Sequence, residues 1–273
     1  MNAQTSPEQQ ELLQRAERQA QVVKGLESAL PAHMLLWNRE DTTPYECDGL
    51  TAYRQRPLVV ALPETGEQVQ AVLRVCHALD VPVVARGAGT GLSGGATPHR
   101  LGVTLSLAKF NKILKIDPLS RTAVVQCGVR NLAISEAASP FGLHYAPDPS
   151  SQIACTIGGN VAENSGGVHC LKYGLTLHNV LKISGFTMEG EAIDFGSDAL
   201  DAAGFDLMSV VIGSEGMLAI TTEVTVKLVP KPQLARCIMA SFDDIRKAGD
   251  AVAAVIGAGI IPAGLEMMDK PMT

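Results

Sequence analysis

The sequence predicts an α+β fold, since short apolar runs of strand length alternate with amphipathic segments of helical period along most of the chain. One such unit occupies residues 57–86, where "PLVVAL" and "VPVVAR" predict short buried strands. The segment "TGEQVQAVLRVCHALD" between them predicts an amphipathic helix that Thr65 opens. Two glycine-rich passages, at 81–95 and 147–174, interrupt the alternation and are the candidate binding segments.

The same mixture of elements flanks this unit on both sides. Residues 7–30 predict a helix with Pro7 in its first turn after Ser6, and residues 31–56 predict an irregular lead-in over the surface. Residues 234–261 predict a further strand and helix. Between these ends, strands are expected at "GVTLSL", "ILKID", "TAVVQCG", "NVLKISGFTM" and "EAIDF", a short helix around "VRNLAISEAAS", and an alternating run through Ile220, Val224, Val226 and Leu228.

Composition excludes several classes of function. The 273 residues are 46% hydrophobic and 18% charged, which is typical of a globular chain with room for one large domain or two modest ones. Only 4% of the residues are aromatic, which argues against a single-strand binder built from stacked rings. The net charge of −6 and the lack of a long Lys/Arg run argue against a binder of phosphate backbones. No nucleic-acid partner is expected.

The sequence also predicts a protein of the cytoplasm. No apolar run approaches the roughly 18 to 20 residues of a membrane span, and the first residues are polar, so neither a signal peptide nor a membrane span is expected. The cysteines form no C-x-x-C pair, which predicts reduced thiols and no zinc, iron-sulfur or other metal site built by this chain alone. They are Cys47, Cys76, Cys127, Cys155, Cys170 and Cys237.

The first glycine-rich passage, "VPVVARGAGTGLSGG", satisfies the G-x-G-x-x-G pattern of dinucleotide-binding proteins from Gly89 to Gly94. Asp117 lies about where a ribose-binding acid is sought. That motif requires a helix whose N-terminal amides face the diphosphate. Only seven residues separate Gly94 from the strand expected at Gly102, and Pro98 lies among them. A nicotinamide-binding Rossmann unit is therefore disfavoured.

A helix-free anion site is the favoured alternative for this passage. Glycines allow the positive φ angles that direct successive backbone N–H groups at one anion. Arg86 could add charge beside the phosphates, or could extend along the surface from a strand end. A glycine-rich turn that binds nothing also stays open, although five glycines cost more backbone entropy than such a turn requires.

The second passage, residues 147–174, is too long for a simple connection and is typical of a binding loop. Its Gly-Gly pairs at 158–159 and 166–167 would leave no side chain between the backbone and a flat or anionic ligand. Asn160 and Asn164 offer donors and acceptors to ligand hydroxyls, or they cap turns within the loop.

Four segments in this order resemble the FAD-binding domain of the vanillyl-alcohol oxidase / p-cresol methylhydroxylase flavoprotein superfamily. Within it, the chain is similar to the FAD-linked subunits of bacterial glycolate oxidases, which are related to D-lactate and D-2-hydroxyglutarate dehydrogenases. The resemblance spans about residues 40–273 and corresponds to the N-terminal half of such a protein. The segments are "PLVVALPETGEQVQAVLRVCHALDVPVVARGAGTGLSGGA", "APDPSSQIACTIGGNVAENSGGVHCLKYGLT", "VIGSEGMLAITTEVTVKLVP" and "LEMMD".

This resemblance implies a domain organisation. Residues 1–56 would form an N-terminal helical arm and lead-in. The FAD-binding domain would occupy 57–232, with two α+β subdomains at about 57–112 and 113–232 that clamp an extended FAD. Residues 233–273 would be the incomplete start of a substrate-binding or cap domain of α+β type.

The resemblance also implies which residues bind FAD, in three clusters. The first would wrap the diphosphate through backbone amides and comprises Arg86, Gly87, Ala88, Gly89, Thr90, Gly91 and Leu92. The second would run along the ribityl chain toward the isoalloxazine and comprises Pro147, Asp148, Cys155, Thr156, Gly158, Gly159, Asn160, Ala162, Asn164, Gly166 and Gly167. The third would approach the adenosine side and comprises Glu215, Gly216 and Ile220.

The FAD is expected to be non-covalent. Some relatives tether the flavin through a histidine at the position of Thr90, and threonine cannot form that bond. Cys155 on the second passage could invite a thioether, but a packed thiol is favoured.

The implied reaction is oxidation of a small 2-hydroxy acid of the glycolate or D-lactate type to the 2-oxo acid. It would need a base for the hydroxyl proton and a cation for the carboxylate. In the superfamily these groups lie mainly in the second domain, so no catalytic residue is assigned. The six histidines show no paired ligand spacing, and His169 and Lys172 are the titratable residues of the second passage to watch.

The resemblance implies companion oxidase subunits, among them an iron-sulfur subunit that would pass electrons on, and through them a peripheral position at the inner membrane. A catalytically silent FAD-binding fragment or subunit is the second hypothesis. The segment "LARCIMASFDDIRKAGDAVAAVIGAGIIP" is expected to expose apolar faces in either case.

Overall fold

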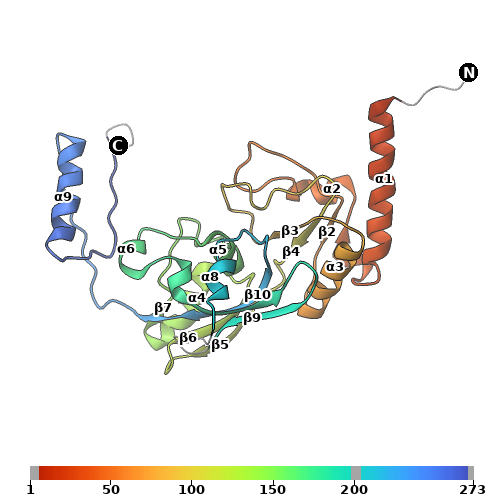
Figure 1. The fold of residues 1–273 in the computed structure, drawn as a ribbon. Coiled ribbons are helices and arrows are strands. Elements are labelled where there is room, and N and C mark those ends of the chain that lie inside the picture. The colour runs from red at the N-terminus through yellow and green to blue at the C-terminus, as the bar shows by residue number, and fades with distance from the viewer. Residues whose placement is uncertain (1–5, 198–203, 270–273) are drawn as a thin grey trace, which may run out of the picture.

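The computed structural model describes residues 6–197 and 204–269, which contain two larger β-sheets flanked by helices (Figure 1) and a third sheet of two short strands. The first sheet has the strand order β1-β2-β4-β3 and the second the order β5-β6-β10-β8-β9, which confirms the α+β prediction. The strands are β1 (Leu35–Leu36), β2 (Val59–Ala61), β3 (Val83–Arg86), β4 (Val103–Ser106), β5 (Ile113–Asp117), β6 (Thr122–Gln126), β7 (Leu143–His144), β8 (Val180–Phe186), β9 (Ala192–Gly196), β10 (Ile220–Lys227) and β11 (Val229–Pro230). The α-helices are α1 (Pro7–Leu26), α2 (Arg39–Thr42), α3 (Gly66–Ala78), α4 (Asn131–Ala138), α5 (Ile157–Glu163), α6 (Cys170–Tyr173), α7 (Thr176–Asn179), α8 (Leu207–Val211) and α9 (Ile245–Gly257).

The first sheet contains the predicted strand-helix-strand unit. Strands β2, β4 and β3 are parallel, and β1 pairs antiparallel with β2. Helix α3 begins where the sequence predicts, because Thr65 accepts a hydrogen bond from the Gln68 backbone and Gln68 returns one to the Thr65 backbone. Strand β3, expected to be buried, is only half-buried because it is the edge strand of this sheet.

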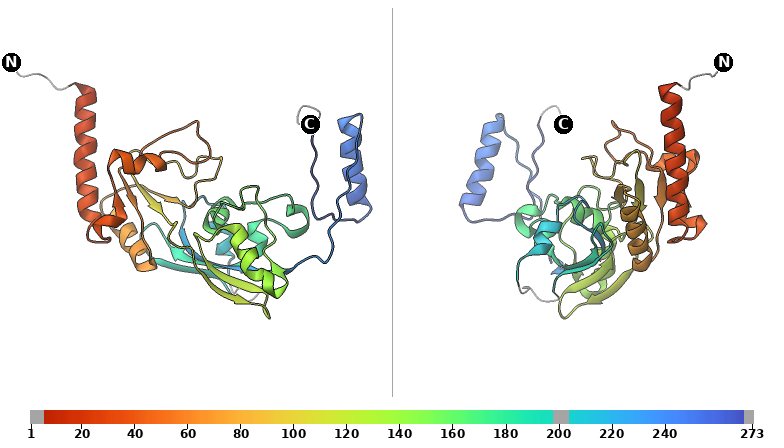
Figure 2. Two further views of the ribbon diagram at one scale, coloured as in Figure 1. Left: turned by 180° about the vertical axis from the view of Figure 1, so that it is seen from behind. Right: turned by 45° about the vertical axis from the view of Figure 1, so that its right-hand side comes forward.

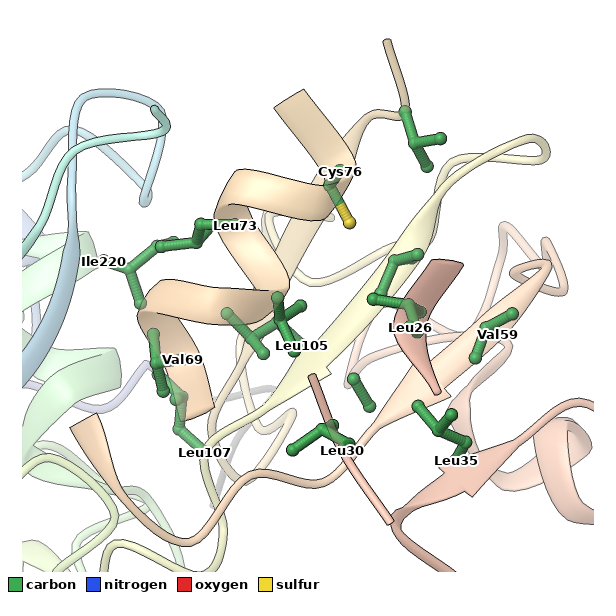
Figure 3. Close-up of a cluster of buried hydrophobic side chains, with 14 of the residues drawn as sticks. Leu26, Leu30, Leu35, Val59, Val69, Leu73, Cys76, Leu105, Leu107 and Ile220 are labelled. Carbon is green, nitrogen blue, oxygen red and sulfur yellow. The ribbon is translucent and has the colours of Figure 1, made fainter. Parts of the chain in front are cut away.

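Helices α1 and α3 and the parallel strands share one hydrophobic core (Figure 3). Leu26 of α1, Leu73 of α3 and Leu105 of β4 are fully buried there. The predicted N-terminal arm therefore contributes its last turns to the core, whereas Leu12 and Leu13 nearer its start are exposed. The helix also ends at Leu26, four residues before the predicted end.

The second sheet is antiparallel throughout. Its core includes Ile134 of α4, Ile157 of α5 and Val224 of β10, all of which have at most 1% of their surface exposed. Ile220 at the start of β10 packs into the first core instead. Strand β10 therefore ties the second sheet to the first layer.

Two passages that were expected to be irregular contain regular structure. Residues 31–56 include β1, α2 and two 3-10 turns, and β1 extends the first sheet. Residues 147–174 include α5 and α6, and α5 starts at the residue before the Gly158-Gly159 pair. Glycine content hid this helix from a reading based on propensity.

The C-terminal segment lies at the opposite end of the molecule from α1 (Figure 2). The strand predicted near its start does not form, and Ile238 and Met239 are more than 90% exposed. Helix α9 forms as predicted, but none of its residues is buried. The expected exposure of apolar faces in this segment is confirmed. In the described part of the chain, no helix combines the length and apolar character needed to cross a membrane.

Candidate functional site

One cleft lies where the two glycine-rich passages and the start of β10 meet. Its space, counted out to open solvent, is about 1040 Å³. The segment from 85 to 91 forms one wall, and residues around the first turn of α5 form the other.

The first wall is a loop without a helix. No helix begins between residues 87 and 102, which confirms the argument against a Rossmann unit. Asp117 lies outside the cleft, where its carboxylate accepts hydrogen bonds from the backbone of Leu119 and Ser120.

Backbone donors of this loop are left without acceptors. Within the described residues, the N–H groups of residues 87–93 donate to no backbone or side-chain atom. Only Gly89 and Gly94 of the five glycines have positive φ, so the loop is not a continuous nest of left-handed residues. Unpaired N–H groups that line a cleft favour an anionic ligand.

The only basic side chain among the lining residues is Arg86. Its guanidinium donates a 2.8 Å hydrogen bond to the carbonyl of Cys47 and lies 5.7 Å from the ring centre of Tyr45. Through these two contacts, Arg86 holds residues 45–47 next to the cleft. A Cβ on Gly89 of the loop would meet Nη2 of Arg86, so the guanidinium lies beside the loop, and the expectation that it adds charge beside the phosphates stays a prediction.

The second wall contains unpartnered polar atoms. The hydroxyl of Thr156 and the amide nitrogen of Asn160 are buried without a hydrogen-bond partner in the described chain, and so are Oδ2 of Asp48 and the hydroxyl of Ser214. All four residues line the cleft. A buried polar atom without a partner costs about 1 to 3 kcal/mol, so native proteins retain few of them. This set of donors and acceptors, opposite the unpaired N–H groups, fits a ligand with hydroxyl, amide and phosphate groups such as FAD.

Carboxylates gather at one side of the cleft. A Cβ placed on Gly95 would lie 3.1 Å from Oε2 of Glu215 and 3.2 Å from Oε1 of Glu163, so the two carboxylates flank the same point of the loop. Burial, together with the charges of Glu215 and Asp48, raises the pKa of Glu163 above its usual value, and a hydrogen bond from Ser93 opposes the shift. In the described chain no cluster of ligating side chains is suited to a metal ion.

The cleft brings most of the predicted FAD-binding residues together. Six lie outside it. Among them, Leu92 is 74% exposed and Asn164 caps the C-terminus of α5, where its side chain accepts from the Leu177 backbone. The residues that line the cleft are Arg86, Gly87, Ala88, Gly89, Thr90, Gly91, Cys155, Thr156, Gly158, Gly159, Asn160, Ala162, Glu215, Gly216 and Ile220; those outside are Leu92, Pro147, Asp148, Asn164, Gly166 and Gly167.

Three glycines of the second passage are required by the packing of the protein itself. A Cβ on Gly158 would lie 2.7 Å from Cβ of Cys127, and one on Gly167 would lie 2.2 Å from the carbonyl oxygen of Asp148. A Cβ on Gly166 would meet Cys170. At Gly158, Gly166 and Gly167 the missing side chain serves the packing of the protein, whereas a Cβ on Gly159 would meet only Oγ1 of Thr156, at 3.4 Å, so that glycine does leave space in the cleft. For Asn164 the turn-capping alternative holds.

The packed-thiol interpretation of Cys155 agrees with its environment. The thiol is buried, and burial raises its pKa, which disfavours the reactive thiolate.

The sequence reasoning missed several residues of the cleft. Asp48 comes from the lead-in, where no pattern distinguishes it, and Ser214 lies beside the predicted Glu215. Adjacency to Glu215 is the one signal that could have found Ser214. The other additional lining residues are Ala85, Gly95, Ala96, Leu107, Cys127, Ser151, Val161, Glu163, Ser165, Val211, Ala219 and Thr221.

Comparisons with known proteins agree on one family. Residues 57–196 match the family described as "FAD binding domain", and residues 231–273 match "FAD linked oxidases, C-terminal domain". The glycolate oxidase subunit GlcD of Escherichia coli K12 is 64% identical over 91% of this chain and 50% of its own length. The GlcD subunit of Bacillus subtilis is 42% identical over 83% of this chain and 48% of its own length. A D-lactate dehydrogenase of Archaeoglobus fulgidus is 35% identical over 78% and 47%.

The solved structures that resemble this one share its fold. An alkyldihydroxyacetonephosphate synthase superposes with a TM-score of 0.77 at 22% identity and covers 90% of this chain and 47% of that one. The chain spans about half the length of the curated relatives it matches. Since the FAD-binding match alone covers more than half of its residues, the chain belongs to the FAD-binding domain family of FAD-linked oxidases.

Proposed function

We propose that this chain is the FAD-binding half of an FAD-dependent dehydrogenase that oxidises a small 2-hydroxy acid, of the glycolate or D-lactate type, to the 2-oxo acid. The single observation that carries the proposal is the cleft, where unpaired backbone donors of residues 87–91 line one wall and the buried, unpartnered side-chain atoms of Thr156 and Asn160 lie on the other. The names of the glycolate oxidase and D-lactate dehydrogenase relatives support the substrate class.

The loop and the facing wall would bind different parts of FAD. The N–H groups of residues 87–91 would bind the diphosphate, while Thr156 and Asn160 would bind polar groups of the ribityl chain and flavin ring. Glu215 and Gly216 would lie on the adenosine side. When bound, the flavin supplies the two-electron acceptor for the oxidation. The FAD is non-covalent in this proposal, because Thr90 offers no nucleophile of the required kind.

The second half of the enzyme would complete the substrate site. Residues 233–273 would begin that domain after an FAD-binding domain at 57–232, in agreement with the second family match. The exposed α9 supports this, because an amphipathic helix with no buried residue requires a partner surface. Companion subunits, including an iron-sulfur subunit, would carry the electrons onward, and the assembly would be cytoplasmic or peripheral to the inner membrane. The word "subunit" in the names of two relatives supports such an assembly.

A catalytically silent FAD-binding module is the second candidate. It is favoured by one observation: among the described residues that line the cleft there is no histidine and no lysine.

Reconstitution with FAD separates these candidates. The chain, and the same chain continued through its second domain, would each be mixed with FAD, freed of excess ligand and examined by visible absorbance. Flavin bands in both, released by acid precipitation, are expected. Anaerobic glycolate or D-lactate should bleach the bands of the longer protein. Flavin bands that no 2-hydroxy acid bleaches would favour the silent module, and no bands at all would exclude both candidates.

A further inference from the structure

A buried carboxylate oxygen of the lead-in lines the cleft without a partner. Asp48 has 5% of its surface exposed, and its Oδ1 accepts a 2.9 Å hydrogen bond from the backbone N–H of Leu50. Its Oδ2 is buried and has no hydrogen-bond partner within the described chain. A buried carboxylate oxygen requires a hydrogen-bond donor. Because Asp48 lines the cleft, a ligand bound there can supply that donor.

The position of Asp48 along the first glycine-rich loop shows which end of the cleft it serves. A Cβ on the neighbouring Gly49 would lie 2.7 Å from the carbonyl oxygen of Gly91. At the other end of the loop, a Cβ on Gly87 would meet Oγ1 of Thr156. The loop therefore runs from Thr156, which the proposed function assigns to the ribityl side, to Asp48 at the far end.

The end of the cleft that contains Asp48 is acidic. A Cβ on Gly95 would lie within 3.2 Å of carboxylate oxygens of both Glu163 and Glu215. Burial and the charge of Glu215 raise the pKa of Glu163, and the charge of Asp48 raises it further, so the three carboxylates lie near one another. Carboxylates repel phosphate groups but accept hydrogen bonds from hydroxyl groups. The diphosphate of a ligand is therefore expected nearer Arg86, at the start of the loop.

FAD presents hydroxyl donors on both sides of its diphosphate. The ribityl chain carries them on one side, and the ribose of the adenosine half carries two neighbouring hydroxyls on the other. With the ribityl chain beside Thr156, the adenosine ribose falls at the end of the loop where Asp48 lies. An acidic side chain that accepts from a ribose hydroxyl is a recurrent way of binding dinucleotides.

We propose that Oδ2 of Asp48 accepts a hydrogen bond from a ribose hydroxyl in the adenosine half of FAD. The inference rests on the proposed function and adds a cofactor contact to it. The contact comes from the lead-in at 31–56, outside the segment at 57–232 that the resemblance assigns to the FAD-binding domain. The lead-in then has two roles, since it also packs against the carbonyl side of the glycine-rich loop through Gly49.

The test compares two ligands on the full-length protein with its second domain, after FAD has been removed. The ligands are FAD and an FAD analogue whose adenosine carries 2′,3′-dideoxyribose, and the change in flavin fluorescence on binding gives each Kd. Both ligands have the same diphosphate, so the ratio of their Kd values is independent of any repulsion between the phosphates and Asp48. Wild type should bind the analogue about 10- to 100-fold more weakly than FAD, as expected for one lost hydrogen bond to a charged acceptor.

Two variants of Asp48 should reduce this ratio. Asp48→Asn keeps an oxygen for the Leu50 N–H but replaces the charged acceptor with a neutral amide, so the ratio should fall below about fivefold. Asp48→Ala offers neither donor nor acceptor, so its ratio should be about one. Asp117→Asn is the matched control, because Oδ1 of Asp117 also accepts from the N–H two residues later, at Leu119, and lies outside the cleft. The control should keep the wild-type ratio.

The outcomes separate this contact from the proposed function. If the Asp48 variants bind both ligands more weakly but keep the wild-type ratio, Asp48 only supports the loop, and the inference is overturned while FAD binding stands. A wild-type ratio near one would overturn it as well. Asp48→Asn retains the turn to Leu50, so it decides the question even where Asp48→Ala does not fold. A wild-type protein that binds neither ligand would overturn both the contact and the proposed function.

Discussion

The two glycine-rich passages look alike in sequence, but individual glycines in them serve different ends. In the loop from Arg86 to Gly95, a Cβ on Gly91 would meet only Oε1 of Glu163, at 3.5 Å. In the passage from Thr156 to Gly167, a Cβ on Gly158 would meet Cβ and the carbonyl oxygen of Cys127, and one on Gly167, outside the cleft, would meet the backbone of Asp148. Gly91 thus keeps ligand space open, whereas Gly158 and Gly167 let two segments of protein pack together; Gly87 and Gly89 of the first loop also meet protein atoms, those of Thr156 and Arg86. A glycine pattern in the sequence does not distinguish these roles. The atoms that a Cβ added to each glycine would meet do distinguish them.

The largest expected effect is a difference in the free energy of unfolding between Gly167→Ala and Gly91→Ala. The new methyl group at 167 would lie within 2.5 Å of three atoms of Asp148, so we expect it to lower the free energy of unfolding by about 3 kcal/mol, at the upper end of overpacking effects. Gly91→Ala should leave the unfolding of the FAD-free protein within about 0.5 kcal/mol of wild type and weaken FAD binding instead. Urea denaturation of the FAD-free chain and fluorescence titration with FAD measure the two effects. Equal loss of unfolding free energy in both variants would show that Gly91 and Gly167 do not differ in their role.

An intermediate effect is expected at Thr156, whose buried hydroxyl has no partner in the described chain. Thr156→Val removes that hydroxyl with little change in shape, so the FAD-free protein should gain about 1 kcal/mol of stability and bind FAD about five- to tenfold more weakly. Thr104→Val is the matched control, because Thr104 in β4 also has a buried, unpartnered hydroxyl but does not line the cleft. It should gain similar stability with unchanged FAD affinity. Loss of FAD affinity in both variants would remove the argument for Thr156.

The smallest expected effect is a change in the pH dependence of the Tm, caused by Glu163 on the carboxylate side of the cleft. Its pKa is raised in the folded protein, so its protonated form is favoured by folding. This contribution is fully present below the ordinary value of 4.5 and is lost as pH rises through the folded pKa. Glu163→Gln should therefore raise the Tm at pH 7 and leave it nearly unchanged at pH 4, as scanning calorimetry would record.

Glu67 provides a control of opposite sign for this measurement. Hydrogen bonds at the start of α3 lower its pKa, so its contribution is present above its ordinary pKa and is lost as pH falls. Glu67→Gln should lower the Tm at pH 7. The same sign in both variants would contradict the assigned cause of the Glu163 shift.

What the sequence could predict was local. Thr65 and the period of the following residues predict α3, and Pro98 with the short spacing to Gly102 excludes a helix after the glycine loop. Asp48 could not be found this way, because it reaches the cleft through a contact between segments distant in sequence, the hydrogen bond from Arg86 to Cys47.

The strand predicted near residue 238 failed for a related reason. Apolar composition favours a strand, but a strand requires a neighbour to accept its hydrogen bonds, and no described strand lies beside this segment. Pairing information of this kind is non-local and is not contained in a window of sequence.

The attachment of α1 has a consequence for synthesis. Its Arg15 and Arg18 donate to the carbonyls of Arg100, Pro57 and Leu79, residues that leave the ribosome after the helix does. At about 5 to 20 residues per second, several seconds pass between the emergence of α1 and that of its last acceptor. Throughout that interval Leu26 has no core to enter. The first helix to be made therefore cannot complete its docking before residue 100 emerges, and a chaperone that binds nascent apolar segments would encounter it first.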